Sequence, residues 1–131
     1  MNLAKEISSW SKDPSSKVGA IIVGDQRRIL STGYNGFPSG ISDDHRLQTR
    51  EEKYPLVIHA EMNALLSALN NGVSVRNSTL FVYNLPICSD CCKSIIQAGI
   101  KKVVIMKADE SNRWYDNWVR SKSYFQEAEA R

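Results

Sequence analysis

Two short apolar runs separated by a helical pattern constrain the fold of this chain more than any other feature. Residues 78–85 and 101–107 are rich in β-branched and aromatic side chains, and each is predicted to be a strand. Between them, residues 89–99 begin with a serine and end at Gly99, as a helix does. Because strands joined through a helix usually run parallel in one sheet, this unit indicates a fold of the α/β class.

The rest of the chain extends this unit. Residues 18–24 and 27–34 are predicted to be strands, and the short turn between them favours an antiparallel hairpin. Three further helices are predicted, at residues 2–10, 59–71 and 112–130. Helices on both faces of a mixed central sheet would form a three-layer α/β/α sandwich. We expect residues 1–131 to form a single domain, since this length suits one hydrophobic core.

Two of the predicted helices carry apolar faces. The residues at helical spacing are Met62, Leu65, Leu66 and Leu69 in one helix and Trp114, Tyr115 and Trp118 in the last one. The aromatic group favours core or subunit-interface packing, although one ring could stack on a base. An apolar face left exposed on so small a sandwich favours a homo-oligomer, whose subunit number the sequence does not fix.

Composition narrows the class of partner. The net charge of +3 comes from 17 basic and 14 acidic residues, too small a surplus to indicate a nucleic-acid partner. No apolar run approaches the roughly 18–20 residues of a membrane span, and the N-terminus lacks a signal-peptide core. We therefore expect no membrane partner and a cytoplasmic location, in the host cytoplasm if the source is a virus.

The three cysteines lie within five residues of one another, at Cys88, Cys91 and Cys92. An odd number in a chain predicted to be cytoplasmic indicates reduced thiols or metal ligands. Cys88 and Cys91 form a Cys-x-x-Cys at a strand-to-helix junction, where two thiolates can bind one ion. Taken alone, this spacing also suits buried thiols or a redox pair.

His59 is a third candidate ligand. It is the first residue of the predicted helix 59–71, which is separated in the chain from the cysteines by the predicted strand 78–85. Zinc with three protein ligands usually keeps its fourth position open, as in catalytic sites. Two residues along a helix correspond to a turn of about 200°, so Glu61 is not expected to share the ligand face of His59. In the first helical turn it could lean over the open position and carry a proton to a substrate nitrogen.

The chain resembles the deoxycytidylate (dCMP) deaminase family of the cytidine deaminase-like superfamily. The resemblance lies in "SKDPSSKVGAIIV", "GYNGFPSGISDD", "HAEMNALL" and "CSDCCKSIIQAGIKKVVIM", in this order. The His-x-Glu…Pro-Cys-x-x-Cys pattern is the signature of zinc deaminases that act on bases. The resemblance implies one zinc ion held by His59, Cys88 and Cys91, and Glu61 as the proton shuttle. It also implies that Asn35 and the Ala60 N–H bind the nucleoside and the base carbonyl.

The activity that the resemblance implies is hydrolysis of dCMP to dUMP with release of ammonia. Members of the family are often hexamers activated by dCTP and inhibited by dTTP, and Mg²⁺ could accompany such a triphosphate. Lys17 and Arg113 are candidates for the 5′-phosphate of the substrate. Lys12, Arg46 and Arg50 better suit an effector triphosphate.

Other functions remain open at this point. The same site could act on free cytidine or deoxycytidine, or on adenosine in tRNA, although the low charge disfavours the latter. A zinc-stabilised binding module without catalysis is a third hypothesis. It is disfavoured because a purely structural zinc site does not require a carboxylate such as Glu61 beside an open coordination position.

This sequence departs from the family pattern at three places. Ile87 intervenes between Pro86 and Cys88, where the family usually has Pro-Cys, so an extra residue or a shifted bulge is expected there, with the Cys-x-x-Cys intact. Cys92 follows Cys91 at about 100° around the helix and is predicted to be a packed thiol. The family generally continues into a short final strand, which is expected to be absent here, in either a compact variant or a chain with trimmed ends.

Overall fold

The computed structural model describes residues 1–106 and 109–129. Four strands form one mixed sheet in the order β2-β1-β3-β4. The central strand β1 (Gly19–Val23) pairs antiparallel with both β2 (Ile29–Tyr34) and β3 (Thr79–Tyr83). The edge strand β4 (Lys102–Ile105) pairs parallel with β3, through the helical connection α4 (Ser89–Gln97). The predicted hairpin and the predicted parallel pair are both confirmed.

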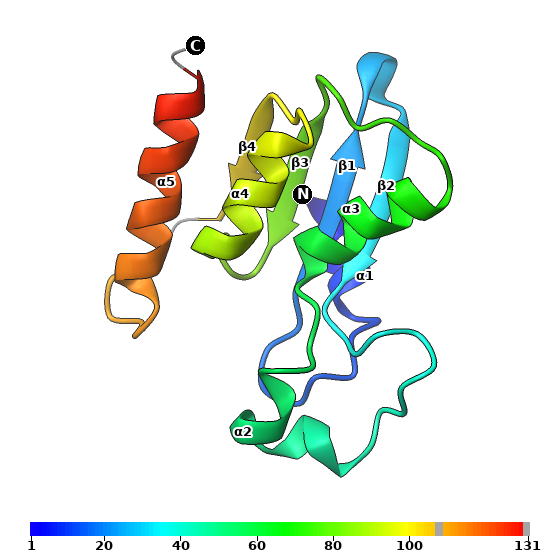
Figure 1. Ribbon diagram of the computed structural model, residues 1–131, viewed down its shortest axis with the longest axis vertical. Helices are drawn as coiled ribbons and strands as arrows, with labels where there is room; N and C mark the ends of the chain where they lie inside the picture. The colour runs from blue at the N-terminus through cyan, green and yellow to red at the C-terminus, as the bar shows by residue number, and fades with distance from the viewer. Residues whose placement is uncertain (107–108, 130–131) are drawn as a thin grey trace.

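Helices lie on both faces of this sheet (Figure 1). One face is covered by α1 (Asn2–Ser8), and the other by α4 and α3 (Ala60–Asn70). The last helix, α5 (Tyr115–Glu129), packs against α4. The expected three-layer α/β/α sandwich with a mixed sheet is confirmed. None of the helices in the described part of the chain is long and apolar enough to cross a membrane.

The strand β1 explains why the sheet carries two helical layers. Its side chains alternate between the faces, as in any strand. Ile21 packs with Ala4 and Ile7 of α1, whereas Ala20 and Ile22 join the larger core beneath α3 and α4. Because both sets are apolar and buried, the strand requires cover on each side.

The face with which α3 meets the sheet differs from the apolar face of the sequence pattern. Leu66 and Leu69 are exposed, and the buried positions are Ala60, Glu61, Ala64 and Ala68. The cause is close packing: a Cβ on Gly33 of β2 would meet the backbone of Ala60 and Ala64 at less than 3.0 Å. Only small side chains fit where the helix lies this near to the strand, so Leu66 and Leu69 are left on the outer side, while Met62 and Leu65 are partly buried against the core.

Three short helical segments have no counterpart in the prediction. They are η1 (Asp25–Arg27), η2 (His45–Gln48) and α2 (Arg50–Lys53). Segments of three or four residues are too short to show a hydrophobic period, which explains the omission. The predicted strand end at Lys107 and helix end at Ala130 lie outside the described residues.

Candidate metal and catalytic site

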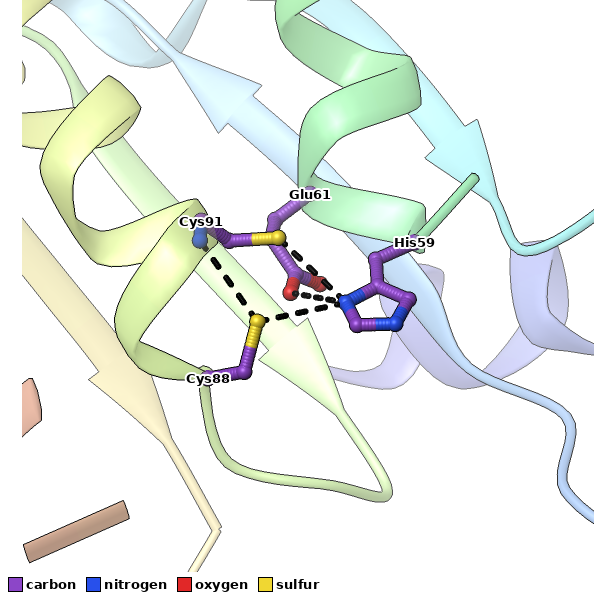
Figure 2. Close-up of side chains that lie close together, drawn as sticks. All are labelled: His59, Glu61, Cys88 and Cys91. Atoms are coloured by element: carbon purple, nitrogen blue, oxygen red, sulfur yellow. Dashed lines mark hydrogen bonds and ion pairs between the residues drawn. The ribbon is translucent and has the colours of Figure 1, made fainter. Parts of the chain in front are cut away.

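The N-termini of α3 and α4 meet at one point above the sheet (Figure 2). His59 is the N-cap residue of α3 and Cys88 is the N-cap residue of α4, both with extended backbone angles. Cys91 lies one turn into α4, and Glu61 lies in the first turn of α3. The adjacent starts of α3 and α4 therefore bring together the side chains of His59 and Cys88, which are 29 residues apart in the sequence.

The four side chains converge closely. His59 Nδ1 lies 3.4 Å from Cys88 Sγ and 3.3 Å from Cys91 Sγ. Glu61 Oε1 lies 3.8 Å from the same nitrogen. One atom from each residue lies within 4.8 Å of all the others, so the group could hold a metal ion. The soft sulfurs and the imidazole form the donor set that zinc prefers.

Protonation at this point is strongly shifted by the neighbouring groups. The hydrogen bond from the Cys91 thiol, with a further contribution from His59, lowers the pKa of Cys88 to about 4. The same bond raises the pKa of Cys91. The hydrogen bond with Cys88 raises the pKa of His59, and the negative charge of Glu61 raises it further. Burial of His59 acts in the opposite direction but is outweighed. The Cys88 thiolate is thus stabilised at the helix N-terminus.

Glu61 is the most deeply buried polar member of the group, with 3% of its surface exposed. Burial raises the pKa of its carboxyl, while the charge of His59 works in the opposite direction. A carboxyl group with a raised pKa can hold or release a proton at pH values closer to neutrality. Glu61 therefore has the environment of a proton carrier.

A cavity of about 730 Å³ opens in front of these residues. His59, Glu61 and Cys88 form part of its wall, and the aromatic rings of Tyr54 and Trp114 form another part. These two rings meet edge to face, with centroids 6.2 Å apart. A volume of this size suits a small molecule, and the wall combines apolar and aromatic side chains with many polar and charged groups, as a site for a polar ligand requires.

Asn35 and Ala60 both line this cavity. Ala60 is the first residue of α3, and backbone N–H groups of a first turn have no carbonyl partner within the helix. The Asn35 amide holds the loop before β1: Nδ2 donates to the Ser16 carbonyl at 2.8 Å, and Oδ1 accepts from the Val18 N–H at 2.9 Å. Asn35 thus shapes the cavity wall, while its part in substrate binding stays a prediction.

The candidate cations are distributed unevenly. Arg113 lines the cavity, where its guanidinium donates to the Tyr54 hydroxyl at 2.7 Å. Lys17 lies outside the lining residues, and its Nζ donates to the Ser11 carbonyl at 2.6 Å. Lys12 and Arg46 pair with surface carboxylates, whereas Arg50 lines the cavity.

Lys53 is a charged residue of the cavity wall that the sequence analysis did not predict. It lies in the run "REEKY", where four consecutive charged residues of both signs resemble a solvated surface. In the structure Lys53 is 5% exposed and forms an ion pair with Asp13 at 3.2 Å. A buried lysine cannot be distinguished from an exposed one by its neighbours in the sequence, because its carboxylate partner lies 40 residues away.

The two residues that depart from the family pattern both lie in the core. Ile87 is 2% exposed and packs with the main hydrophobic cluster, so its side chain forms part of the core immediately before Cys88. Cys92 is fully buried, and its thiol donates to the Ser121 carbonyl of α5 at 3.4 Å. Burial raises the pKa of Cys92 to about 11, which suits a packed thiol.

Two helix N-termini that carry His-x-Glu and Cys-x-x-Cys to one point of a three-layer α/β/α sandwich define the class of zinc-binding deaminase folds. The family model described as the cytidine and deoxycytidylate deaminase zinc-binding region matches residues 1–107. The chain belongs to this family.

Known proteins with similar sequences or structures agree with this assignment. The deoxycytidylate deaminase of Homo sapiens is 42% identical over 82% of this chain, and an uncharacterized deaminase in the luxG 3′ region of Aliivibrio fischeri is 39% identical over 96%. The alignments cover 60% and 84% of those proteins. The crystal structure of the cyanophage S-TIM5 dCMP deaminase with dCMP and dUMP is 34% identical, with a TM-score of 0.72 over 92% of this chain and 87% of that one.

The chain spans about 60% of the length of the mammalian deoxycytidylate deaminases that it resembles. The shared part contains the zinc-binding region.

Proposed function

We propose that this protein catalyses the zinc-dependent hydrolytic deamination of dCMP to dUMP, with release of ammonia. The observation that carries the proposal is the convergence of His59, Cys88 and Cys91 on a point beside the buried Glu61. The chain belongs to the deaminase family, and several of its relatives are dCMP deaminases. Both findings support a deoxycytidine nucleotide as the substrate.

The donor set fits a single catalytic zinc ion. Two sulfurs and one imidazole nitrogen leave one position of a tetrahedral site for water or substrate. When bound, zinc lowers the pKa of a coordinated water to about 7 and so supplies a nucleophile at neutral pH. His59, Cys88 and Cys91 would hold the ion, and Glu61 would remain outside the ligand set.

Glu61 performs the proton transfers in this proposal. Hydrolysis at C4 of cytosine adds water and expels ammonia, so a proton must move from the water to the base and another to the leaving amine. The Glu61 carboxyl is buried, and burial raises its pKa. A group in this position can accept the first proton and donate it to the substrate nitrogen.

Substrate binding is assigned to the cavity walls. Asn35 binds the nucleoside, the N–H of Ala60 binds the base carbonyl, and Arg113 contributes positive charge for the 5′-phosphate. Lys17 is the less suitable candidate for the phosphate, since its Nζ bonds a backbone carbonyl outside the cavity lining. The ring of Trp114 is available to cover the base or sugar.

Regulation and assembly form a separate part of the proposal. We infer a homo-oligomer, a hexamer by the family resemblance, because Leu66 and Leu69 leave apolar surface exposed on α3. Activation by dCTP and inhibition by dTTP, with Mg²⁺ bound to the triphosphate, are proposed on the same resemblance. Cys88 and Cys91 must stay reduced to bind zinc, which favours a reducing compartment such as the cytoplasm.

The test is ammonia release from dCMP and from deoxycytidine by the purified, zinc-loaded protein, with and without dCTP and dTTP. The proposal predicts a much larger kcat/KM for dCMP. Equal rates would show that no phosphate site operates, and absence of release from either compound would contradict the deaminase function. Native mass spectrometry of the same sample measures the number of subunits.

A further inference from the structure

A buried network of side chains joins three segments that line the cavity: α2, the loop before β1, and the residue after β2. Lys53 of α2 donates to Asp13 Oδ1 at 3.2 Å and to Ser15 Oγ at 2.7 Å. The same carboxylate oxygen accepts the backbone N–H groups of Ser15 and Ser16, at 2.9 and 3.2 Å. The other oxygen, Oδ2, faces Asn35 Nδ2 at 3.4 Å. The ion pair therefore lies next to the amide that is proposed to bind the nucleoside.

The two charges in this network depend on each other. The Lys53 and Asp13 side chains are only 7% and 5% exposed, so water hydrates and screens their charges little. Removing one partner of a buried pair leaves an uncompensated charge, which then seeks another hydrogen-bond donor or acceptor. Surface ion pairs of this protein, such as Lys93 with Asp90, are exposed and carry no such penalty.

Asn35 has one amide hydrogen that is not strongly engaged. One Nδ2 hydrogen is used by the 2.8 Å bond to the Ser16 carbonyl. The second points to Asp13 Oδ2 at 3.4 Å, which is longer than the usual 2.7–3.2 Å of a strong N–H···O bond. Lys53 and the N–H groups of Ser15 and Ser16 all donate to Asp13 Oδ1. They hold the carboxylate in place, so its Oδ2 forms only a long hydrogen bond with Asn35 Nδ2.

We propose that Lys53 is a positioning residue for substrate binding: it holds the Asp13 carboxylate and so keeps the second amide hydrogen of Asn35 available to an oxygen of the bound nucleoside. The inference rests on the proposed function, in which Asn35 contacts that nucleoside. Without Lys53, Asp13 takes this hydrogen in a charge-assisted bond, and the substrate loses its donor.

The experiment compares Lys53→Met with the wild-type protein, both full length and zinc loaded, in steady-state kinetics with dCMP. KM is expected to rise about tenfold, the effect of one lost hydrogen bond, while kcat changes less than about threefold. Zinc content should not change. Lys5→Met removes one exposed charge from α1 on the opposite face of the sheet and is expected to leave both constants unchanged.

The double variant Asp13→Asn, Lys53→Met tests whether the unpaired Asp13 charge causes the rise in KM. It removes both charges, so Asn35 regains its free hydrogen and KM should return to within about threefold of wild type. If the KM of the folded double variant stays as high as that of Lys53→Met, the unpaired Asp13 charge is not the cause of the weakened binding, and the proposal is overturned. An unchanged KM in folded Lys53→Met would also overturn it.

Two further measurements keep the result unambiguous. If Lys53→Met does not fold, Lys53→Gln removes the charge but retains a donor, and the same KM criterion applies. If the wild type does not deaminate dCMP, the proposed function fails, and the crystal structure of the variant tests the inference separately. An Asn35 Nδ2 to Asp13 Oδ2 distance shortened from 3.4 Å to below about 3.0 Å supports it, and an unchanged distance refutes it.

Discussion

The closeness of α3 to β2 at Gly33 provides a quantitative test of how the fold positions the site. Replacing Gly33 with alanine adds a Cβ within 3.0 Å of the Ala60 and Ala64 backbones, where ordinary Cβ contacts begin at 3.4 Å. The obstructing atoms are backbone atoms, so no side-chain rotation can relieve the clash. Two of these contacts are at 2.4 Å, so the start of α3 and β2 must separate by about 1 Å to reach an ordinary 3.4 Å.

The expected cost follows from overpacking, which typically destabilises by about 1–3 kcal/mol. A loss of about 2 kcal/mol with a urea slope of about 2 kcal/mol/M lowers the unfolding midpoint by about 1 M. Because His59 and Glu61 lie at the start of α3, turnover should also fall, and a displacement near 1 Å can cost about 100-fold.

The assay is urea unfolding of zinc-loaded protein at one fixed protein concentration, with Gly36→Ala as the matched control. A Cβ on Gly36 meets no atom within 4 Å, so this change is expected to be neutral or stabilising by up to about 1 kcal/mol. If Gly33→Ala unfolds at the same urea concentration as Gly36→Ala, the close contact does not determine the position of α3.

Three further predictions concern individual side chains. Arg113→Ala should raise KM for dCMP about tenfold or more while changing that for deoxycytidine little, because only dCMP carries the phosphate; equal effects would remove this role. Cys92→Ala should lose about 1 kcal/mol of stability yet keep one zinc per chain by metal analysis, whereas zinc loss would make Cys92 a ligand. For Asp13, burial works to raise the pKa, but hydrogen bonds from Ser15, Ser16 and Lys53 outweigh it and lower the pKa below 3.8. The stability that results is present above about pH 4 and is lost as the pH falls through the lowered pKa. Asp13→Asn should therefore weaken the loss of stability on acidification in this range, and an unaltered acid profile would contradict this.

The fold was predictable where its signals are local. The alternation of apolar runs with helical periods indicated the four strands, the parallel pair and the helical layers, because these strands and the four longer helices show their period, unlike η1, η2 and α2. The packing face of α3 was not predictable, since Ala60 and Ala64 are selected by the proximity of Gly33 on another element. Hydrophobicity alone points to the larger leucines.

The site was predictable to the extent that its residues carry a recognised spacing. His59 and Cys91 belong to such a pattern, and the structure brings their side chains together. Lys53 belongs to none, because its role depends on an ion pair with a residue 40 positions away. Its burial arises from how α2 folds back onto the loop before β1, which no local pattern encodes.

The central claim is that Glu61 carries protons beside a zinc ion that is held by His59, Cys88 and Cys91. It is tested most directly by measuring zinc content and dCMP turnover for Glu61→Gln, which preserves shape but cannot exchange the proton. The account predicts about one zinc per chain, an unchanged fold, and turnover reduced by about 10²- to 10⁴-fold. Near-normal turnover in the zinc-loaded variant would contradict it.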